Sequence, residues 1–342
     1  MGKMKNFLCR FDLFPVAAML EFRKEGMTMR PLWKDILAAV WLGMLLPGIV
    51  LNAFVWKERS RQKTQEPVQA AAVQLQQPVS VLDPEGGRGQ MELESYLTGV
   101  LLAEMPASFH PEALKAQAVA ARTYTWKAYT TGGKHGDGSV CMDPSCCQGF
   151  LTEEAYLSRG GTGEALEKVR QAVEATAGFV LMFDTELIEA TYFSSASGST
   201  EAAVAVWGTE VPYLQAVESP EQIREDTTVY TADDFQKLLG KSLPGTPEQW
   251  FGPVRYTEGG GVAEIEICGE TYTGTFLRSK LGLRSTAFQV LAEGQTIAIT
   301  TRGYGHRVGM SQYGANALAE AGRSWQEILQ HYYPGTTLVP VF

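Results

Sequence analysis

One glutamate in this 342-residue chain stands among apolar residues in a way that suits acid chemistry. Glu104 follows the apolar run Val100–Leu102 and precedes Met105 and Pro106. A carboxyl held against apolar surface stays protonated to a higher pH, because desolvation disfavours its charged form. Such a carboxyl is suited to donate a proton near neutral pH. The alternative is that Glu104 lies exposed at a helix end, with no chemical role.

A second segment, Tyr304–Ala315, places polar side chains among glycines near the other end of the chain. Glycine lets a ligand or a neighbouring backbone approach closely, so such a segment is typical of a binding groove. Its candidate residues are His306, Ser311, Gln312 and Tyr313. A histidine on its own is more often a satisfied loop residue, but the surrounding pattern favours a groove role for His306.

A third group combines one imidazole with thiols in a loop rich in turn-forming residues. Five residues separate His135 from Cys141 and Cys141 from Cys147, and Cys146 is adjacent. Imidazole and two thiolates suit tetrahedral zinc, with an open fourth position that could hold water or a carboxylate. The alternative is a Cys141–Cys147 disulfide, because cysteines outside the cell tend to pair. The spacing is not a common zinc-finger pattern, so it leaves both interpretations open.

Apolar periodicity predicts the elements that position these residues. The expected helices cover residues 91–105, 111–130, 164–176 and 309–321, with a last helix capped at Ser324. The expected strands cover residues 179–183, 187–193, 262–268, 271–273, 287–291 and 296–300. The strands 262–268 and 271–273 are expected to form one hairpin, and 287–291 and 296–300 another. Helices and strands are mixed without a regular βαβ rhythm. We therefore expect one α+β domain over residues 91–342.

The chain before this domain has a different composition. Residues 36–56 carry no charged side chain, and at about 1.5 Å per residue they are long enough for a hydrocarbon core of about 30 Å. We expect an N-terminal segment over 1–35, a transmembrane helix over 36–56 and a loose linker over 57–90. A cleaved signal peptide and a buried helix of a soluble domain are the alternatives.

Together, these motifs resemble the stage II sporulation protein D family, whose members cleave the glycan strands of bacterial cell wall. The resemblance covers roughly residues 90 to 340 and is most specific at its two ends. The segments that carry it are Leu102–Pro106, Ala120–Tyr124, His135–Gln148, Ser194–Glu201, Trp207–Leu214 and Tyr304–Ala315.

The resemblance implies that Glu104 is the catalytic acid and base of a lytic transglycosylase. In that reaction the carboxyl protonates the oxygen that links N-acetylmuramic acid to N-acetylglucosamine. It then accepts the proton of the muramic C6 hydroxyl as that oxygen attacks C1, which gives a 1,6-anhydro sugar. No water is consumed, so one carboxyl is sufficient, in contrast to the carboxyl pair of ordinary glycosidases.

The resemblance also implies the remaining site residues. Those expected to bind substrate are Arg122, Gln148, Ser197, Thr200, Tyr213, His306, Ser311, Gln312 and Tyr313. Some members bind zinc through a pattern that His135, Cys141, Cys147 and Gln148 match. We therefore expect one zinc ion per chain, either structural or holding its loop against the Glu104 site.

Three positions depart from the family's usual sequence. Cys146 stands where members often have histidine, so the resemblance implies that Cys146 can substitute as a zinc ligand. Gln215 stands where some members have lysine. Arg307 replaces the first glycine of His-Gly-Val-Gly-Met-Ser-Gln-Tyr-Gly. A left-handed backbone strains a non-glycine residue. Either the turn at Arg307 tolerates this strain or the local groove differs.

The family implies a setting beside a membrane. We expect a single-pass protein of the mother-cell membrane, with residues 1–35 cytoplasmic and with an extracytoplasmic catalytic domain that faces the septal space. Its expected partners are stem-peptide-free glycan strands, a membrane protein and a peptidoglycan amidase of forespore engulfment. The net charge of −9 argues against nucleic acid. The alternatives are a non-catalytic peptidoglycan-binding enhancer of a wall amidase, and a zinc amidase or peptidase that uses the cysteine cluster.

Overall fold

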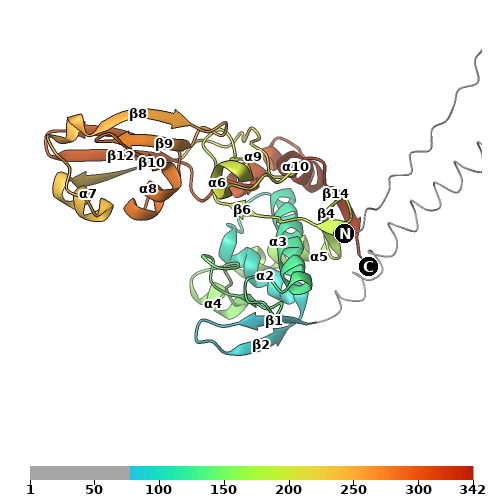
Figure 1. Cartoon of the computed structure of the whole chain (residues 1–342). Helices are drawn as coiled ribbons and strands as arrows, with labels where there is room; N and C mark the ends of the chain where they lie inside the picture. Colours follow the sequence, from blue (N-terminus) through green and yellow to red (C-terminus); the bar gives the residue numbers. More distant parts are fainter. Residues whose placement is uncertain (1–77, 342) are drawn as a thin grey trace, which may run out of the picture. The chain divides into compact units, whose positions relative to one another are not determined.

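The computed structural model of this chain describes residues 78–341 (Figure 1). The expected N-terminal segment, the expected transmembrane helix and the expected linker as far as residue 77 lie outside the described residues. Within residues 78–341, no helix combines the length and apolar character needed to cross a membrane.

The end of the expected linker is a β-hairpin, which corrects the prediction for that part. Strands β1 (Val79–Leu82) and β2 (Arg88–Met91) pair antiparallel, and β1 also pairs with β3 (Val140–Cys141). Val79 and Val81 point into the core, because alternate side chains of a strand share one face. This burial makes the hairpin part of the folded unit.

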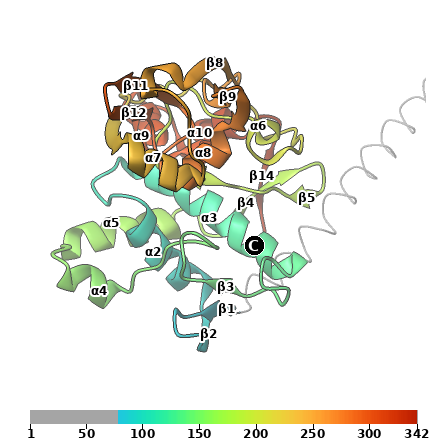
Figure 2. The same ribbon diagram turned by 60° about the vertical axis from the view of Figure 1, so that its left-hand side comes forward.

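Three helices form the part of the fold that carries Glu104. Helices α2 (Leu93–Glu104), α3 (Pro111–Thr131) and α5 (Gly163–Glu174) pack against one another (Figures 1 and 2). Helix α2 stops before Pro106, as predicted, because the residue before a proline leaves the helical region. Helix α3 ends at Gly132, whose φ of 87° suits glycine.

Short strands bring the C-terminal segments onto these helices. Strand β4 (Phe179–Phe183) lies between β5 (Glu186–Leu187) and β14 (Thr337–Pro340) in an antiparallel sheet. Strand β6 (Tyr192–Phe193) pairs in parallel with β13 (Met310–Ser311). The remaining helices of this part are α4 (Glu153–Ser158), α6 (Ala203–Trp207), α9 (Gln312–Glu320) and α10 (Trp325–Tyr332).

The single strand predicted over residues 187–193 is wrong, because it is divided into β5 and β6. Between them the Glu189 N–H donates to the Tyr213 hydroxyl at 2.9 Å. A side chain therefore satisfies a backbone group that a continuous strand would have given to a neighbouring strand.

Residues 225–302 form an antiparallel unit with its own apolar core (Figure 1). Its two sheets have the strand orders β10-β9-β8 and β11-β12-β7, and both predicted hairpins are confirmed. Its elements are β7 (Glu225–Thr231), α7 (Ala232–Leu239), η3 (Pro247–Gln249), β8 (Phe251–Tyr256), β9 (Val262–Ile267), β10 (Glu270–Thr273), α8 (Gly274–Leu281), β11 (Phe288–Glu293) and β12 (Thr296–Arg302). The mixture of helices and antiparallel strands confirms the α+β class.

A buried ion pair joins this unit to the C-terminal motif. Arg307 has φ 66° and a fully buried side chain, whose Nη1 lies 3.2 Å from Glu201 Oε1. The same guanidinium donates to the carbonyl of Gly259, and Glu201 Oε1 accepts the Gly261 N–H at 2.9 Å. Both glycines lie between β8 and β9. The turn thus holds a non-glycine residue in a left-handed conformation, and its side chain binds the antiparallel unit.

Replacing Glu201 by alanine is expected to lower the free energy of unfolding by about 3–5 kcal/mol, because the Arg307 cation then stays buried without its partner. Urea unfolding monitored by circular dichroism measures this change. Adding Arg307→Gly removes the cation and places glycine at a positive φ, so part of the loss should be recovered. A double variant no more stable than Glu201→Ala alone would contradict this account.

Candidate active site

The two motifs at opposite ends of the domain line one cleft of about 780 Å³. Glu104 comes from α2, Cys146 and Cys147 from the loop after α3, and His306 from the C-terminal motif. A hollow of about 730 Å³ beside α5 contains none of the predicted site residues. The cleft is therefore where the structure brings the predicted chemistry together.

The Glu104 carboxyl is held by the backbone of a neighbouring loop. The Gly149 N–H donates to Glu104 Oε1 at 2.5 Å. A Cβ atom at position 149 would lie 3.0 Å from that oxygen, so glycine allows this close approach. Burial raises the pKa of Glu104, although the Gly149 N–H and the nearby Gln312 amide oppose the rise. The burial of this carboxyl thus favours its protonated form, as the sequence predicts.

Two glutamines lie close to this carboxyl. Gln148 is buried, accepts from the Thr125 hydroxyl and donates to the Tyr192 hydroxyl, each at 2.8 Å. Gln312 is also buried, and its Nε2 has no hydrogen-bond partner among the described residues. The Gln148 amide fixes the wall of the cleft, whereas the Gln312 amide keeps a donor close to Glu104.

His306 forms an aromatic wall of the cleft. Its Nδ1 accepts the Val308 N–H at 3.1 Å, so Nε2 carries the proton of the neutral ring. The ring packs between Phe193 and Trp207, with centroids 5.8 and 5.6 Å away. Burial, aided by the nearby Arg278 cation, lowers the pKa of His306 to about 4. His306 is therefore a neutral donor at neutral pH.

Ser311 and Tyr313 of the same motif contact other residues of the domain and do not line the cleft. Ser311 is buried, caps α9 and donates to Glu221 Oε1 at 2.6 Å. The Tyr313 ring packs edge-on against Phe109, with the Arg224 guanidinium 4.6 Å from its centroid. Neither side chain lines the cleft: the pairing of β13 with β6 holds Ser311 in the core, and Tyr313 lies on α9 against Phe109.

Arg122, which was expected to bind substrate, does not face the cleft. Its side chain is fully buried, and its Nε and Nη2 donate to the two Glu94 oxygens at 2.9 and 2.6 Å. Further donors reach the carbonyls of Val173 and Phe179. Arg122 therefore joins α3 to α2 and to the start of β4.

The three predicted substrate-binding residues between positions 197 and 213 also lie away from the cleft. Thr200 is buried between the backbone groups of Gln215 and Val217. Tyr213 is buried, with its hydroxyl on the Glu189 N–H, so it has no free face on which a sugar can stack. Ser197 is half-buried and does not line the cleft.

Sequence reasoning missed several residues that do line the cleft. Trp207 is 45% exposed and Tyr304 is 52% exposed, and both flank His306. Arg278 reaches the same cleft from α8 of the antiparallel unit. Trp207 and Tyr304 stand at the edges of recognised motifs, but nothing in the sequence around Arg278 marks it.

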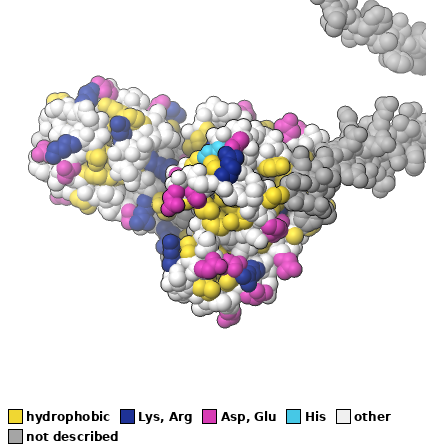
Figure 3. Space-filling view, turned by 90° about the horizontal axis from the view of Figure 1, so that it is seen from below, with side chains coloured by type: hydrophobic (Ala, Val, Ile, Leu, Met, Phe, Trp, Pro, Cys, Tyr) yellow, Lys and Arg dark blue, Asp and Glu magenta, His cyan; other side chains and the backbone are white. Residues whose placement is uncertain are grey.

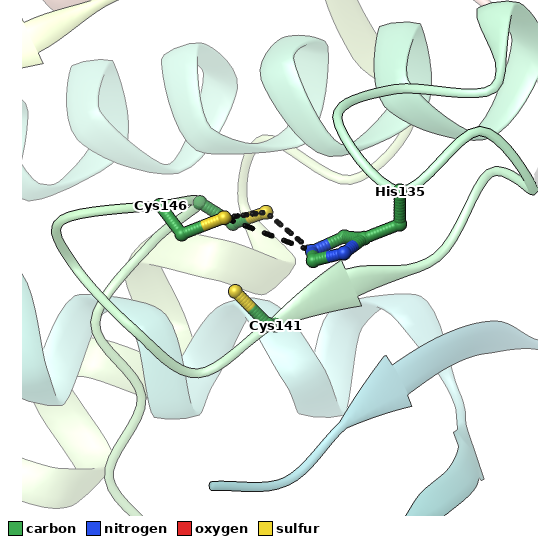
Figure 4. Close-up of side chains that lie close together, drawn as sticks. His135, Cys141 and Cys146 are labelled. Atoms are coloured by element: carbon green, nitrogen blue, oxygen red, sulfur yellow. Dashed lines mark hydrogen bonds between the residues drawn. The ribbon is translucent and has the colours of Figure 1, made fainter. Parts of the chain in front are cut away.

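The predicted metal ligands converge on one point (Figure 4). Ligand atoms of His135, Cys141, Cys146 and Cys147 all lie within 4.8 Å of one another. Cys147 Sγ lies 3.5 Å and Cys146 Sγ 3.8 Å from His135 Nε2, and the two sulfurs are 3.9 Å apart. Bond lengths of about 2.3 Å for Zn–S and 2.0 Å for Zn–N imply tetrahedral edges of about 3.8 and 3.5 Å.

The arrangement thus fits four-coordinate zinc, with Cys146 as the fourth ligand. Burial opposes ionisation of Cys141, but hydrogen bonds from the Asp143 backbone and from the cluster outweigh it and lower its pKa to about 7. The three thiols are free, so the alternative Cys141–Cys147 disulfide is not formed in the described part of the chain.

Comparisons with known proteins show which family the chain resembles in sequence. Residues 88–183 match the family described as Stage II sporulation protein (SpoIID). The chain is similar to Stage II sporulation protein D of Bacillus subtilis (strain 168), with 37% identity over 299 residues, 84% of this chain and 87% of that protein. For the Bacillus amyloliquefaciens protein of the same name, identity is 40% over 255 residues, 72% and 74% of the two chains.

A further relative carries a different name. The Amidase enhancer of Bacillus subtilis (strain 168) is 32% identical over 301 residues, which cover 71% of this chain and 40% of that protein.

The lowered pKa of His306 predicts a loss of stability in acid. A histidine with a depressed pKa stabilises the fold above its unfolded pKa of about 6.5, and this contribution disappears as the pH falls through about 4. Relative to His306→Gln, the wild type should lose at most about 3 kcal/mol of unfolding free energy between pH 7.5 and 4. Chemical denaturation of both proteins, each freed of metal, measures the difference. A difference that does not change with pH would contradict a buried neutral His306.

Proposed function

Because this chain belongs to the stage II sporulation protein D family, we propose that it is a lytic transglycosylase of peptidoglycan glycan strands. The observation that carries the proposal is the Glu104 carboxyl, whose raised pKa and position in the cleft suit an acid and base. The bond that it would cleave joins N-acetylmuramic acid to N-acetylglucosamine.

The contacts of Glu104 assign a role to each of its oxygens. Gly149 holds Oε1, which leaves Oε2 to carry the proton. Oε2 protonates the bridging oxygen, and the bond to C1 of the muramic sugar breaks. The muramic C6 hydroxyl then attacks C1 and returns its proton to Glu104, which closes the 1,6-anhydro ring and restores the acid.

Neighbouring residues support the binding of a sugar. The Trp207 ring is half-exposed beside His306, and such a flat face packs against the apolar face of a sugar ring. The neutral His306 ring contributes to the cleft without adding a charge to it. The buried Nε2–H₂ donor of Gln312 lies beside the carboxyl. It can donate a hydrogen bond to the Glu104 carboxylate after the proton has left.

A zinc ion in the cysteine cluster would act on this carboxyl through the loop. Cys147 would bind the metal, Gln148 donates to Tyr192, and Gly149 donates to Glu104. Zinc held by three thiolates and one imidazole would be structural, since no coordination position would stay open. The metal would therefore fix the loop whose backbone N–H holds Glu104, and the chemistry would remain with the carboxyl.

The proposed setting follows the family's role in sporulation. The protein would be anchored by residues 36–56 in the mother-cell membrane, with the catalytic domain in the septal space. There it would thin the septal wall during engulfment, beside a membrane partner and an amidase that removes stem peptides.

The second candidate function is a non-catalytic enhancer of a wall amidase. It is favoured by the name of the Amidase enhancer relative, and by the burial of Arg122 and Tyr213 away from the cleft. Such a protein would bind the same strands without cleaving them, so the products distinguish the two functions.

Replacing Glu104 by glutamine is expected to abolish cleavage, reducing the rate at least about a hundredfold because the acid is lost. The full-length protein in detergent is incubated with stem-peptide-free glycan strands, and the products are identified by mass spectrometry. Glu189→Gln removes the other cleft carboxyl and serves as the matched control, because the reaction needs no second carboxyl.

Anhydromuramic ends from the wild type and from Glu189→Gln, but not from Glu104→Gln, would support the proposal. Reducing ends that require both glutamates would indicate hydrolysis instead. Strands that are bound but stay intact would favour the enhancer function.

Metal analysis of the purified protein is expected to give one zinc ion per chain. Cys141→Ser should lose the metal, whereas Cys268→Ser should keep it, because Cys268 lies at the β9–β10 turn outside the cluster. Chelation should lower the free energy of unfolding by about 2.7 kcal/mol relative to free zinc at a hundred times its Kd. A chain without metal whose mass is about two hydrogens lower would instead indicate a disulfide.

A further inference from the structure

Two cations line the cleft: the Lys134 ammonium donates to the Cys146 carbonyl, whereas the Arg278 guanidinium has no counter-ion in the described chain. Arg278 extends from α8 toward His306 and Tyr304, and its Nε is buried without a hydrogen-bond partner among residues 78–341. The other arginines of the antiparallel unit, Arg255, Arg284 and Arg302, are each paired with a carboxylate of that unit. Arg278 is therefore distinguished by its position and by its missing partner.

Electrostatics at this position favour an anionic ligand. Burial of the Arg278 side chain lowers its pKa, and its charge also helps to keep His306 neutral. A partly desolvated guanidinium with an unused donor gains most from a carboxylate, which accepts two parallel hydrogen bonds. A neutral amide of the same size offers one acceptor and no charge. Position 278 can thus discriminate between an acid and its amide.

We propose that Arg278 binds the free lactyl carboxylate of the muramic acid, and so selects strands without stem peptides. This inference rests on the proposed function. In an intact strand the lactyl carboxyl is joined to the stem peptide as a neutral amide, and removal of the peptide releases the carboxylate. The lactyl group is borne by the sugar whose C1 is attacked, which places the carboxylate in the cleft that Glu104 and Arg278 share.

Binding rather than cleavage tests this proposal. Full-length Glu104→Gln protein, which leaves the strands intact, is titrated with three strands of equal length and its affinity is measured by calorimetry. One strand carries free lactyl carboxylates, one carries lactyl carboxamides, and one carries whole stem peptides. The second substitution is Arg278→Gln. Lys280→Gln, which removes an exposed cation from the same helix, is the control.

Arg278→Gln should weaken binding of the carboxylate strand about tenfold to a hundredfold, and leave binding of the carboxamide strand unchanged. Lys280→Gln should change neither. Unchanged affinity of Arg278→Gln for the carboxylate strand, with the parent still binding, would overturn the role of Arg278 and leave the proposed function standing. Tighter binding of the stem-peptide strand, lost in Arg278→Gln, would assign Arg278 to a peptide carboxylate instead. No binding of any strand by the parent would overturn both proposals.

Discussion

The hydrogen bond from Gly149 to Glu104 is the contact on which the site depends. It joins the end of α2 to a loop whose neighbouring residues are all fixed by other means: Cys147 in the thiol cluster, Gln148 on Tyr192, and Phe150 stacked on Tyr96 at 5.5 Å. A backbone donor has no rotamers to lose, so the carboxyl is oriented at little entropic expense. The cysteine cluster thereby influences the acid without touching it.

A second constraint acts at the opposite wall. The C-terminal motif is held between the strand pairing of β13 with β6 and the ion pair of Arg307 with Glu201. The two side chains of that ion pair also form hydrogen bonds with the turn between β8 and β9. These bonds connect the antiparallel unit to the short segment that carries His306. This connection allows a residue of α8 to contribute to a cleft built mainly by other elements.

Local signals in the sequence were sufficient for much of the fold. Pro106 and Gly132 end their helices through backbone geometry alone, and the two hairpins of the antiparallel unit follow alternating apolar patterns. Tertiary contacts decided the rest. The partner of Arg122 is Glu94, twenty-eight residues away on another helix, and no local pattern encodes that choice. The hairpin that contains Val79 was missed because its surroundings have the composition of a linker.

The cleft is complete only when the segment that carries His306 has packed beside the segment that carries Glu104. Glu104 is made early in synthesis, but the wall formed by His306 and the β13 segment comes from the end of the chain, and β14 then closes the sheet beside β4. Contacts across so many residues form late in folding, because a long loop must first be closed. A nascent chain therefore contains Glu104 before the C-terminal wall of its cleft has formed.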